Sequence, residues 1–269
     1  MERYLSSAWI RPLIAFLFKV MSRDDSRCSG GVVFVSSKLC IKSTPQTSLA
    51  EANAMEFVRQ NPTIPVPRVY SAFGYKGHVY IVMQRIEGTI VARNWHLRTE
   101  KSRLKILSQL KSMVEQLRKL QCPDGAGVSN IDRGPIFDPR LPKQFYWGPF
   151  DEISDFHSAL VDGLDLNVPS ADAFPELQEL ASFYNQPWPQ PIFTHGDLSS
   201  LNILCKEDSV VAILDWETAG WLPPYWEYVT AWNVNPQNSF WQEEVDKFLT
   251  PLLYARNMDA IRRKYFGFF

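Results

Sequence analysis

The chain has 269 residues, a length that suits one large domain or two joined lobes. Hydrophobic residues make up 45% of the sequence, and 28 Lys and Arg stand against 29 Asp and Glu, which gives a formal net charge of −1. This composition excludes a disordered chain, and its lack of a basic excess argues against a nucleic-acid-binding protein.

The cysteines indicate a reducing compartment. They are Cys28, Cys40, Cys122 and Cys205, and no two of them have the CxxC spacing of a zinc or redox site. A chain of this length with so few cysteines has no disulfide framework, so we expect free thiols and a cytoplasmic location.

An apolar stretch covers residues 12–18, between Arg11 and Lys19. It is too short to cross a bilayer, which takes about 20 residues, so no integral membrane segment is predicted. A signal peptide is the alternative, because Arg3 and Arg11 precede the stretch, but no small-residue cleavage site follows Lys19. We favour an amphipathic helix that packs on the body of the protein, within an N-terminal extension of residues 1–28.

Residues 29–84 predict a small antiparallel β-sheet with one helix. The strand segments are rich in β-branched residues, and the helical segment has apolar side chains about every 3.6 residues. The expected strands are residues 31–36, 38–42, 69–73 and 78–84, and the expected helix is residues 48–60.

Residues 85–269 predict a larger, mainly helical lobe. Thr99 caps a long amphipathic helix that ends near Leu120. Its apolar face comprises Leu104, Leu107, Leu110, Met113, Val114 and Leu117. Residues 122–150 are expected to form a long ordered loop; a loop of this length is usually functional or disordered. Further helices are expected over residues 151–164, 174–184 and from 225 onward, with a short hairpin of residues 202–205 and 210–214. The fold class is therefore α+β.

The strongest motif is a His-x-Asp-x4-Asn spacing from His195 to Asn202, with Asp215 at the end of the following hairpin. Phosphoryl transfer needs one carboxylate that orients the acceptor hydroxyl and takes its proton. It also needs a carboxylate and an amide oxygen on Mg²⁺, an ion that prefers oxygen ligands. Asp197 fits the first role, and Asn202 and Asp215 fit the second. A turn rich in capping residues would explain Asp197 alone but neither the hairpin nor the second Asp.

His195 is expected to be structural rather than catalytic, because Asp197 already fills the role of the base. Its ring can hold the loop through hydrogen bonds to the backbone or to the metal-binding Asp.

These motif segments resemble the aminoglycoside phosphotransferase family of the protein-kinase-like superfamily, in its fungal branch. The segments are residues 195–204 and 213–220, supported by 64–69, 148–150 and 221–228. The resemblance runs from about Val32 to Trp232. It implies a protein-kinase-like two-lobe fold, with an ATP-binding N-lobe of residues 29–84, a hinge and a C-lobe of residues 85–269.

The resemblance also implies roles for single residues. Asp197 is the expected base, with Asn202 and Asp215 as the expected Mg²⁺ ligands. Lys42 would contact the α- and β-phosphates of ATP and pair with Glu51; the plain alternative is a surface Lys and a Glu favoured by the helix dipole. The backbone C=O of Gln84 and N–H of Ile86 would hydrogen-bond adenine; the alternative is a simple strand end and turn.

The sequence departs from the family pattern in three places. Only Ser29-Gly30-Gly31 is available as a phosphate-covering loop, Ser199-Ser200 stands where many relatives have His-Pro, and Asp215-Trp216-Glu217 replaces Asp-Phe-Gly. Glu217 is either a further metal or substrate contact or a solvent-facing residue.

The predicted function is ATP- and Mg²⁺-dependent transfer of the γ-phosphate to a hydroxyl of a small molecule. The alternative is a nucleotide-binding pseudo-enzyme or regulatory module, which the missing Gly-rich loop supports. A protein kinase is disfavoured, because little chain lies between Asp215 and Trp221 for an activation loop and no Ala-Pro-Glu follows.

The resemblance places the acceptor pocket in the C-lobe, between the loop after the long helix and the last helices. Aromatic residues outnumber acidic ones in those segments, which suits a flat or methylated-cation acceptor better than a polycation. Most of these aromatics are nevertheless expected to be core. They are Phe145, Tyr146, Trp147, Phe150, Trp221, Tyr225, Trp226 and Trp232. The identity of the acceptor and the oligomeric state stay open.

Overall fold

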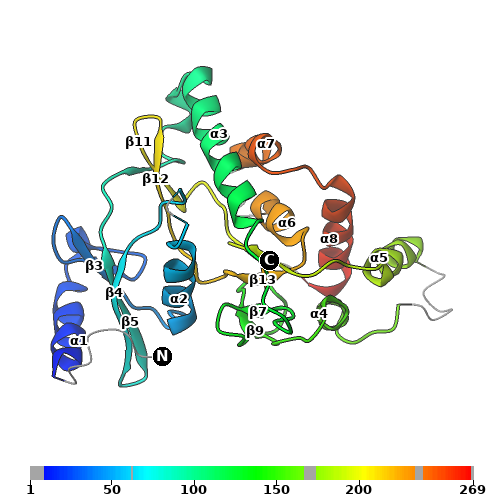
Figure 1. Ribbon diagram of the computed structural model, residues 1–269, viewed down its shortest axis with the longest axis horizontal. Coiled ribbons are helices and arrows are strands. Elements are labelled where there is room, and N and C mark those ends of the chain that lie inside the picture. Colours follow the sequence, from blue (N-terminus) through cyan, green and yellow to red (C-terminus); the bar gives the residue numbers. More distant parts are fainter. Residues whose placement is uncertain (1–8, 62, 167–173, 234–238, 268–269) are drawn as a thin grey trace. The chain divides into compact units, whose positions relative to one another are not determined.

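The computed structural model describes residues 9–61, 63–166, 174–233 and 239–267. The helices are α1 (Ile10–Met21), α2 (Leu49–Val58), α3 (Glu100–Leu117), α4 (Ile153–Leu160), α5 (Pro175–Asn185), α6 (Trp226–Asn233), α7 (Ser239–Phe248) and α8 (Leu253–Phe266) (Figure 1). The longer strands are β2 (Val32–Phe34), β3 (Leu39–Lys42), β4 (Val69–Tyr75), β5 (His78–Gln84), β10 (Ile192–Thr194), β11 (Ile203–Lys206), β12 (Ser209–Ile213) and β13 (Gly220–Leu222). Two-residue strands are β1 (Cys28–Ser29), β6 (Thr89–Ile90), β7 (Ser129–Asn130), β8 (Ile136–Phe137) and β9 (Tyr146–Trp147). The predicted extension of residues 1–28 is described only from residue 9, so Arg3 lies outside the described residues.

The chain forms two compact units. The first is Met1–Ile106 with Ser200–Glu217, and the second is Leu107–Ser199 with Thr218–Phe269. The chain therefore changes unit inside the predicted catalytic loop, after Ser199, and again after Glu217. The lobe boundaries proposed from the sequence, at residues 28 and 84, stay predictions.

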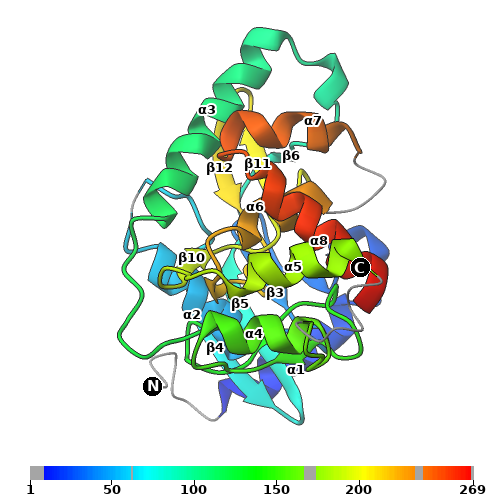
Figure 2. The ribbon, with the colours of Figure 1, turned by 90° about the vertical axis from the view of Figure 1, so that its right-hand side faces the viewer.

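The first unit contains a five-stranded antiparallel sheet in the order β1-β2-β3-β5-β4. The predicted hairpins are confirmed, since β2 pairs with β3 and β4 pairs with β5. The sequence did not predict β1, which is only two residues long and pairs Cys28 with Val33. In Figures 1 and 2 α1 and α2 lie beside this sheet.

Alternation along β3 assigns its side chains to two different faces. Ile41 joins a buried cluster with Ala15 of α1 and with Phe73, Tyr80 and Val82 of the sheet. The next residue, Lys42, must then point to the opposite face, which α2 covers. The position of this lysine thus follows from the strand period of two.

Helix α1 packs on the sheet as expected for an amphipathic leading helix, with Ile14 and Phe18 against the same cluster. Its other side leaves Leu13 and Phe16 largely exposed. None of the helices in the described part of the chain is both long enough and apolar enough to span a membrane.

A second small sheet of the first unit carries the predicted metal ligands. Strands β11 and β12 form the predicted hairpin, and β6 pairs with β11 on the other side. The Ile213 N–H donates to the Pro65 C=O at 2.8 Å, which ties the hairpin to the extended segment before β4. This contact fixes the strand end from which Asp215 follows.

The second unit is mainly helical, which confirms the α+β class. Figures 1 and 2 show α5 beside α8, with short strands in the order β10-β13-β7. The buried face of α3 comprises Ile106, Leu107, Leu110, Met113, Val114 and Leu117. The prediction for Leu104 was wrong: its side chain is 51% exposed, and Ile106 is buried instead.

The predicted long loop of residues 122–150 is ordered and contains β7, β8 and β9. Of the eight aromatic residues named from the sequence, Trp147, Trp221, Tyr225 and Trp226 are buried as expected. Phe145 and Tyr146 are 53% and 46% exposed, and Phe150 and Trp232 are partly buried. All four cysteines are free thiols, and the cytoplasmic location inferred from them stays a prediction.

Candidate active site

Four charged side chains meet in the first unit. The Lys42 Nζ donates to Glu51 at 2.8 Å, to Asp215 at 2.6 Å and to Glu217 at 3.1 Å. Lys42 and Glu51 are 6% and 2% exposed. The structure therefore brings together three of the residues predicted from the sequence and adds Glu217.

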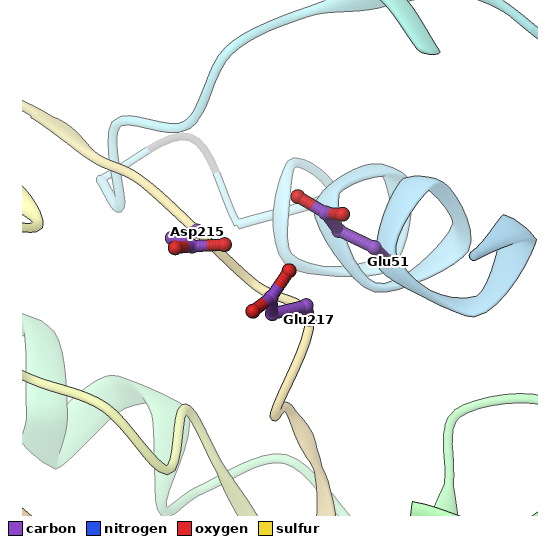
Figure 3. Close-up of side chains that lie close together, drawn as sticks. All are labelled: Glu51, Asp215 and Glu217. Carbon is purple, nitrogen blue, oxygen red and sulfur yellow. The ribbon is translucent and has the colours of Figure 1, made fainter. Parts of the chain in front are cut away.

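Local structure explains why the cluster forms. Lys42 lies at the end of β3, and Glu51 lies in the first turn of α2, where the Ser48 hydroxyl caps the helix by accepting the Glu51 N–H at 3.2 Å. Asp215 and Glu217 follow β12, with Trp216 between them pointing away: its indole N–H donates to the Ile213 C=O at 3.0 Å. Figure 3 shows the three carboxyl groups turned toward one another.

The electrostatics of the cluster favour the ionised lysine. Burial alone would lower the pKa of Lys42, but Glu51, Asp215 and Glu217 outweigh it and raise that pKa above its usual range. Burial raises the pKa of Glu51, and Lys42 opposes this shift. Lys42 is thus a fixed positive charge held by a buried partner.

Asp215 has an unusual backbone. Its φ is +62°, a left-handed conformation that is uncommon for a residue other than glycine. The preceding residue, Leu214, donates its N–H to the Asn202 C=O at 2.7 Å, so the backbone just before Asp215 is bonded to Asn202. Backbone strain of this kind concentrates at functional sites.

The acidic residues fit a hard divalent cation. One carboxylate oxygen each of Glu51, Asp215 and Glu217 lies within 4.8 Å of the others. Together they carry more negative charge than the single ammonium of Lys42 neutralises, and oxygen is the donor that Mg²⁺ prefers. The donor set therefore fits the predicted metal. Glu217, which the sequence left as either a contact or a solvent-facing residue, points into the cluster and not into solvent, with its side chain 20% exposed.

Asp197 lies in the second unit, in a loop held from several sides. The Asp197 N–H donates to His195 Nδ1 at 3.1 Å, so the ring of His195 bonds the loop backbone as expected. The Glu227 carboxylate accepts the N–H groups of His195 and Gly196 at 2.7 and 3.0 Å. The sequence did not identify Glu227 as a support of this loop, because Glu227 bonds backbone N–H groups of residues that are distant along the chain.

Gly196 is required by the loop geometry, which leads to a prediction. Its φ is +81°, and an added Cβ would lie 2.9 Å from the Thr218 C=O oxygen. Gly196→Ala is expected to lower the free energy of unfolding by about 1–3 kcal/mol. Chemical denaturation measures this. Gly163→Ala is the matched control, because Gly163 has a φ of +70° but open space around it. Equal losses in the two variants would show that the contact with Thr218 does not matter.

The predicted adenine contacts lie at the end of β5. The Gln84 N–H donates to the Arg68 C=O at 2.8 Å, and Ile86 follows two residues beyond the strand. Gly30 and Gly31, which the sequence left as the available candidates for a phosphate-covering loop, form the tight turn between β1 and β2 with φ of +55° and +74°. Positive φ at both positions is typical of a two-residue hairpin turn.

The chain matches a known protein family over most of its length. The profile of the phosphotransferase enzyme family matches residues 36–263. The chain belongs to this family. The family resemblance inferred from the motif segments is therefore confirmed, whereas the fungal branch stays a prediction. The matched range contains Lys42, Glu51, Asp197, Asn202 and Asp215.

Solved structures confirm the protein-kinase-like fold. A thermostable mutant of the aminoglycoside phosphotransferase APH(4)-Ia, in a ternary complex with ADP and hygromycin B, has a TM-score of 0.63 and 17% identity over 92% of this chain and 87% of that one. The aminoglycoside phosphotransferase APH(3'')-Id from Streptomyces rimosus, in complex with ADP and streptomycin, has a TM-score of 0.53 and 17% identity over 96% of this chain and 99% of that one. No curated protein sequence matches the chain significantly.

Proposed function

We propose that this phosphotransferase uses Mg-ATP and transfers the γ-phosphate to a hydroxyl of a small molecule. The observation that carries the proposal is the buried contact of Lys42 with Glu51, Asp215 and Glu217. A surface lysine would not be held this way. An ammonium fixed beside potential metal ligands is what a bound triphosphate needs for charge neutralisation.

Each residue of the cluster has a separate role in the proposed reaction. Lys42, held by Glu51, contacts the α- and β-phosphates. Asp215 and Asn202 hold Mg²⁺, with Glu217 as a further oxygen donor. When bound, the metal neutralises charge that develops on the phosphate oxygens. The backbone C=O of Gln84 and N–H of Ile86 hold adenine.

Asp197 is the proposed base. Its carboxylate orients the acceptor hydroxyl and takes its proton as the oxygen attacks the γ-phosphorus. The reaction requires Asp197 and the Lys42 cluster to act on one ATP molecule. Both relatives named above bind ADP together with an aminoglycoside; for this chain we propose only a small hydroxyl compound as acceptor.

Acceptor-dependent release of ADP tests the function. Wild-type protein is expected to release ADP when Mg²⁺, ATP and a hydroxyl compound of the right class are present together. The alternative, a nucleotide-binding pseudo-enzyme, predicts binding of Mg-ATP in calorimetry without ADP release for any member of a panel of sugars, aminoglycosides and amino alcohols.

Variants of the proposed metal ligands Asp215 and Glu217 test the metal site. Asp215→Asn is expected to lower kcat about 10²–10³-fold, the usual loss when one electrostatic contact to the transition state is removed. Glu217→Gln is expected to cost less, because two other ligands remain. Steady-state kinetics across a Mg²⁺ titration measures both effects. Glu207→Gln, an exposed change on the turn after β11, is the control; unchanged Mg²⁺ dependence in Asp215→Asn would refute the assignment.

A further inference from the structure

A buried ion pair lies in the ordered loop after α3, outside the residues used so far. The Asp138 carboxylate accepts the Arg140 Nε–H at 2.7 Å and the Nη2–H at 2.8 Å. It also accepts the Arg140 backbone N–H at 3.0 Å. The Asp138 and Arg140 side chains are 4% and 15% exposed. Two-point contact from a carboxylate fixes the plane of the guanidinium.

The guanidinium of Arg140 also contacts the loop of the proposed base. Its Nη2 donates to the C=O of Gly196. Its Nη1 lies 3.9 Å from Oδ1 of Asp197. All of these residues belong to the second unit. One guanidinium therefore links Asp138 to both the backbone before the base and the carboxylate of the base.

This placement has two physical consequences. The hydrogen bond to the Gly196 C=O limits the positions that the backbone before Asp197 can take, and displacement of a catalytic group by about 1 Å can cost about 10²-fold in rate. The Arg140 guanidinium also attracts the negative carboxylate of Asp197 through space, since its Nη1 lies 3.9 Å from Oδ1. Arginine keeps its charge at any physiological pH, so this support is permanent.

We propose that Arg140, oriented by Asp138, is a positioning residue that holds the loop of Asp197 through the Gly196 C=O and places a positive charge beside the Asp197 carboxylate. The proposal rests on the proposed function of Asp197 as the base. Arg140 itself is not proposed to contact the nucleotide or the acceptor. Its effect should therefore fall on kcat and not on the affinity for Mg-ATP.

Kinetics of Arg140→Met and Arg140→Lys test the proposal. Arg140→Met is expected to lower kcat about 10–100-fold with the Kd for Mg-ATP unchanged. Arg140→Lys keeps the charge without the two-point contact and is expected to recover part of the loss. Asp138→Asn, a milder change to the same bridge, is expected to lower kcat in the same direction and serves if Arg140→Met fails to fold.

Arg262→Met is the matched control. Arg262 is fully buried, and its Nε–H donates to Asp259 at 2.9 Å within α8. This variant is expected to lower Tm while keeping kcat at temperatures below unfolding. A kcat in Arg140→Met that stays at the wild-type value, or falls no more than in Arg262→Met, overturns the proposal.

A double-mutant cycle measured by thermal unfolding separates the role of Arg140 from the proposed function of Asp197. Arg140→Met, Asp197→Asn and the double variant are compared by their Tm shifts, which need no turnover. Coupled residues are expected to give shifts that do not add. Additive shifts overturn the role of Arg140 whatever the activity. Coupled shifts together with full turnover in Asp197→Asn would instead refute Asp197 as the base and leave the contact intact.

Discussion

Asp197→Asn is expected to lower kcat by about 10²–10⁴-fold, the usual contribution of a general base. The amide has nearly the same shape as the carboxylate but cannot take the proton of the acceptor hydroxyl. The residues proposed to hold nucleotide and metal, among them Lys42 and Asp215, are unaltered in this variant. The Kd for Mg-ATP is therefore expected to stay unchanged, and calorimetry with steady-state kinetics measures both quantities.

A matched control for this change is Asp162→Asn. Asp162 lies in the same unit and pairs with Lys143 at the surface, where both side chains are more than half exposed. It is expected to keep the wild-type kcat. An Asp197→Asn protein with full rate on an accepted substrate would show that another group takes the proton.

Lys42→Met is expected to affect both stability and activity. Removing the ammonium leaves Glu51 buried without its charge partner, a change that typically costs about 3–5 kcal/mol in the free energy of unfolding. The variant also lacks the charge proposed to contact the phosphates, so the KM for ATP should rise and kcat should fall. Denaturant unfolding and ATP-dependent kinetics measure the two effects separately.

The double variant Lys42→Met with Glu51→Gln distinguishes the two effects. Neutralising both partners removes the uncompensated charge, so most of the lost stability should return while activity stays low. Lys38→Met, at an exposed lysine of the same hairpin, should change neither property. Wild-type stability and an unchanged KM for ATP in Lys42→Met would contradict the role given to the cluster.

Much of the fold could be predicted from the sequence because it depends on local patterns. The strand period of two identified the hairpin that ends at Lys42, and the helix stripe identified α2 with Glu51 in its first turn. Asp197 and Asn202 lie in one continuous loop, so the spacing of their residue types could be recognised in the sequence, and their roles stay predictions.

The remaining features depend on contacts between distant segments. Glu217 contacts Lys42, which lies 175 residues away along the chain, and no local pattern predicts such a contact. Glu227 supports the loop through backbone N–H groups, and such partners leave no pattern in the sequence. Arg140 lies in a loop that was expected to be functional, but its contact with the segment of Asp197 arises from tertiary packing.

The sequence lacks a Gly-rich phosphate-covering loop, because only Ser29-Gly30-Gly31 is available for one. The structure has a tight two-residue turn at this position. The buried Lys42 is proposed to supply the positive charge that the phosphates need. This is why we favour an active enzyme over a pseudo-enzyme.

The most direct test of the central proposal is ³¹P NMR of the protein with Mg-ATP and the hydroxyl-compound panel. The γ-phosphate signal of ATP is expected to disappear while ADP and one new phosphomonoester signal grow in equal amounts. The same spectrum recorded with Asp197→Asn should remain that of ATP over the same time. A wild-type protein that binds Mg-ATP but forms no phosphomonoester with any compound of the panel would contradict the proposal.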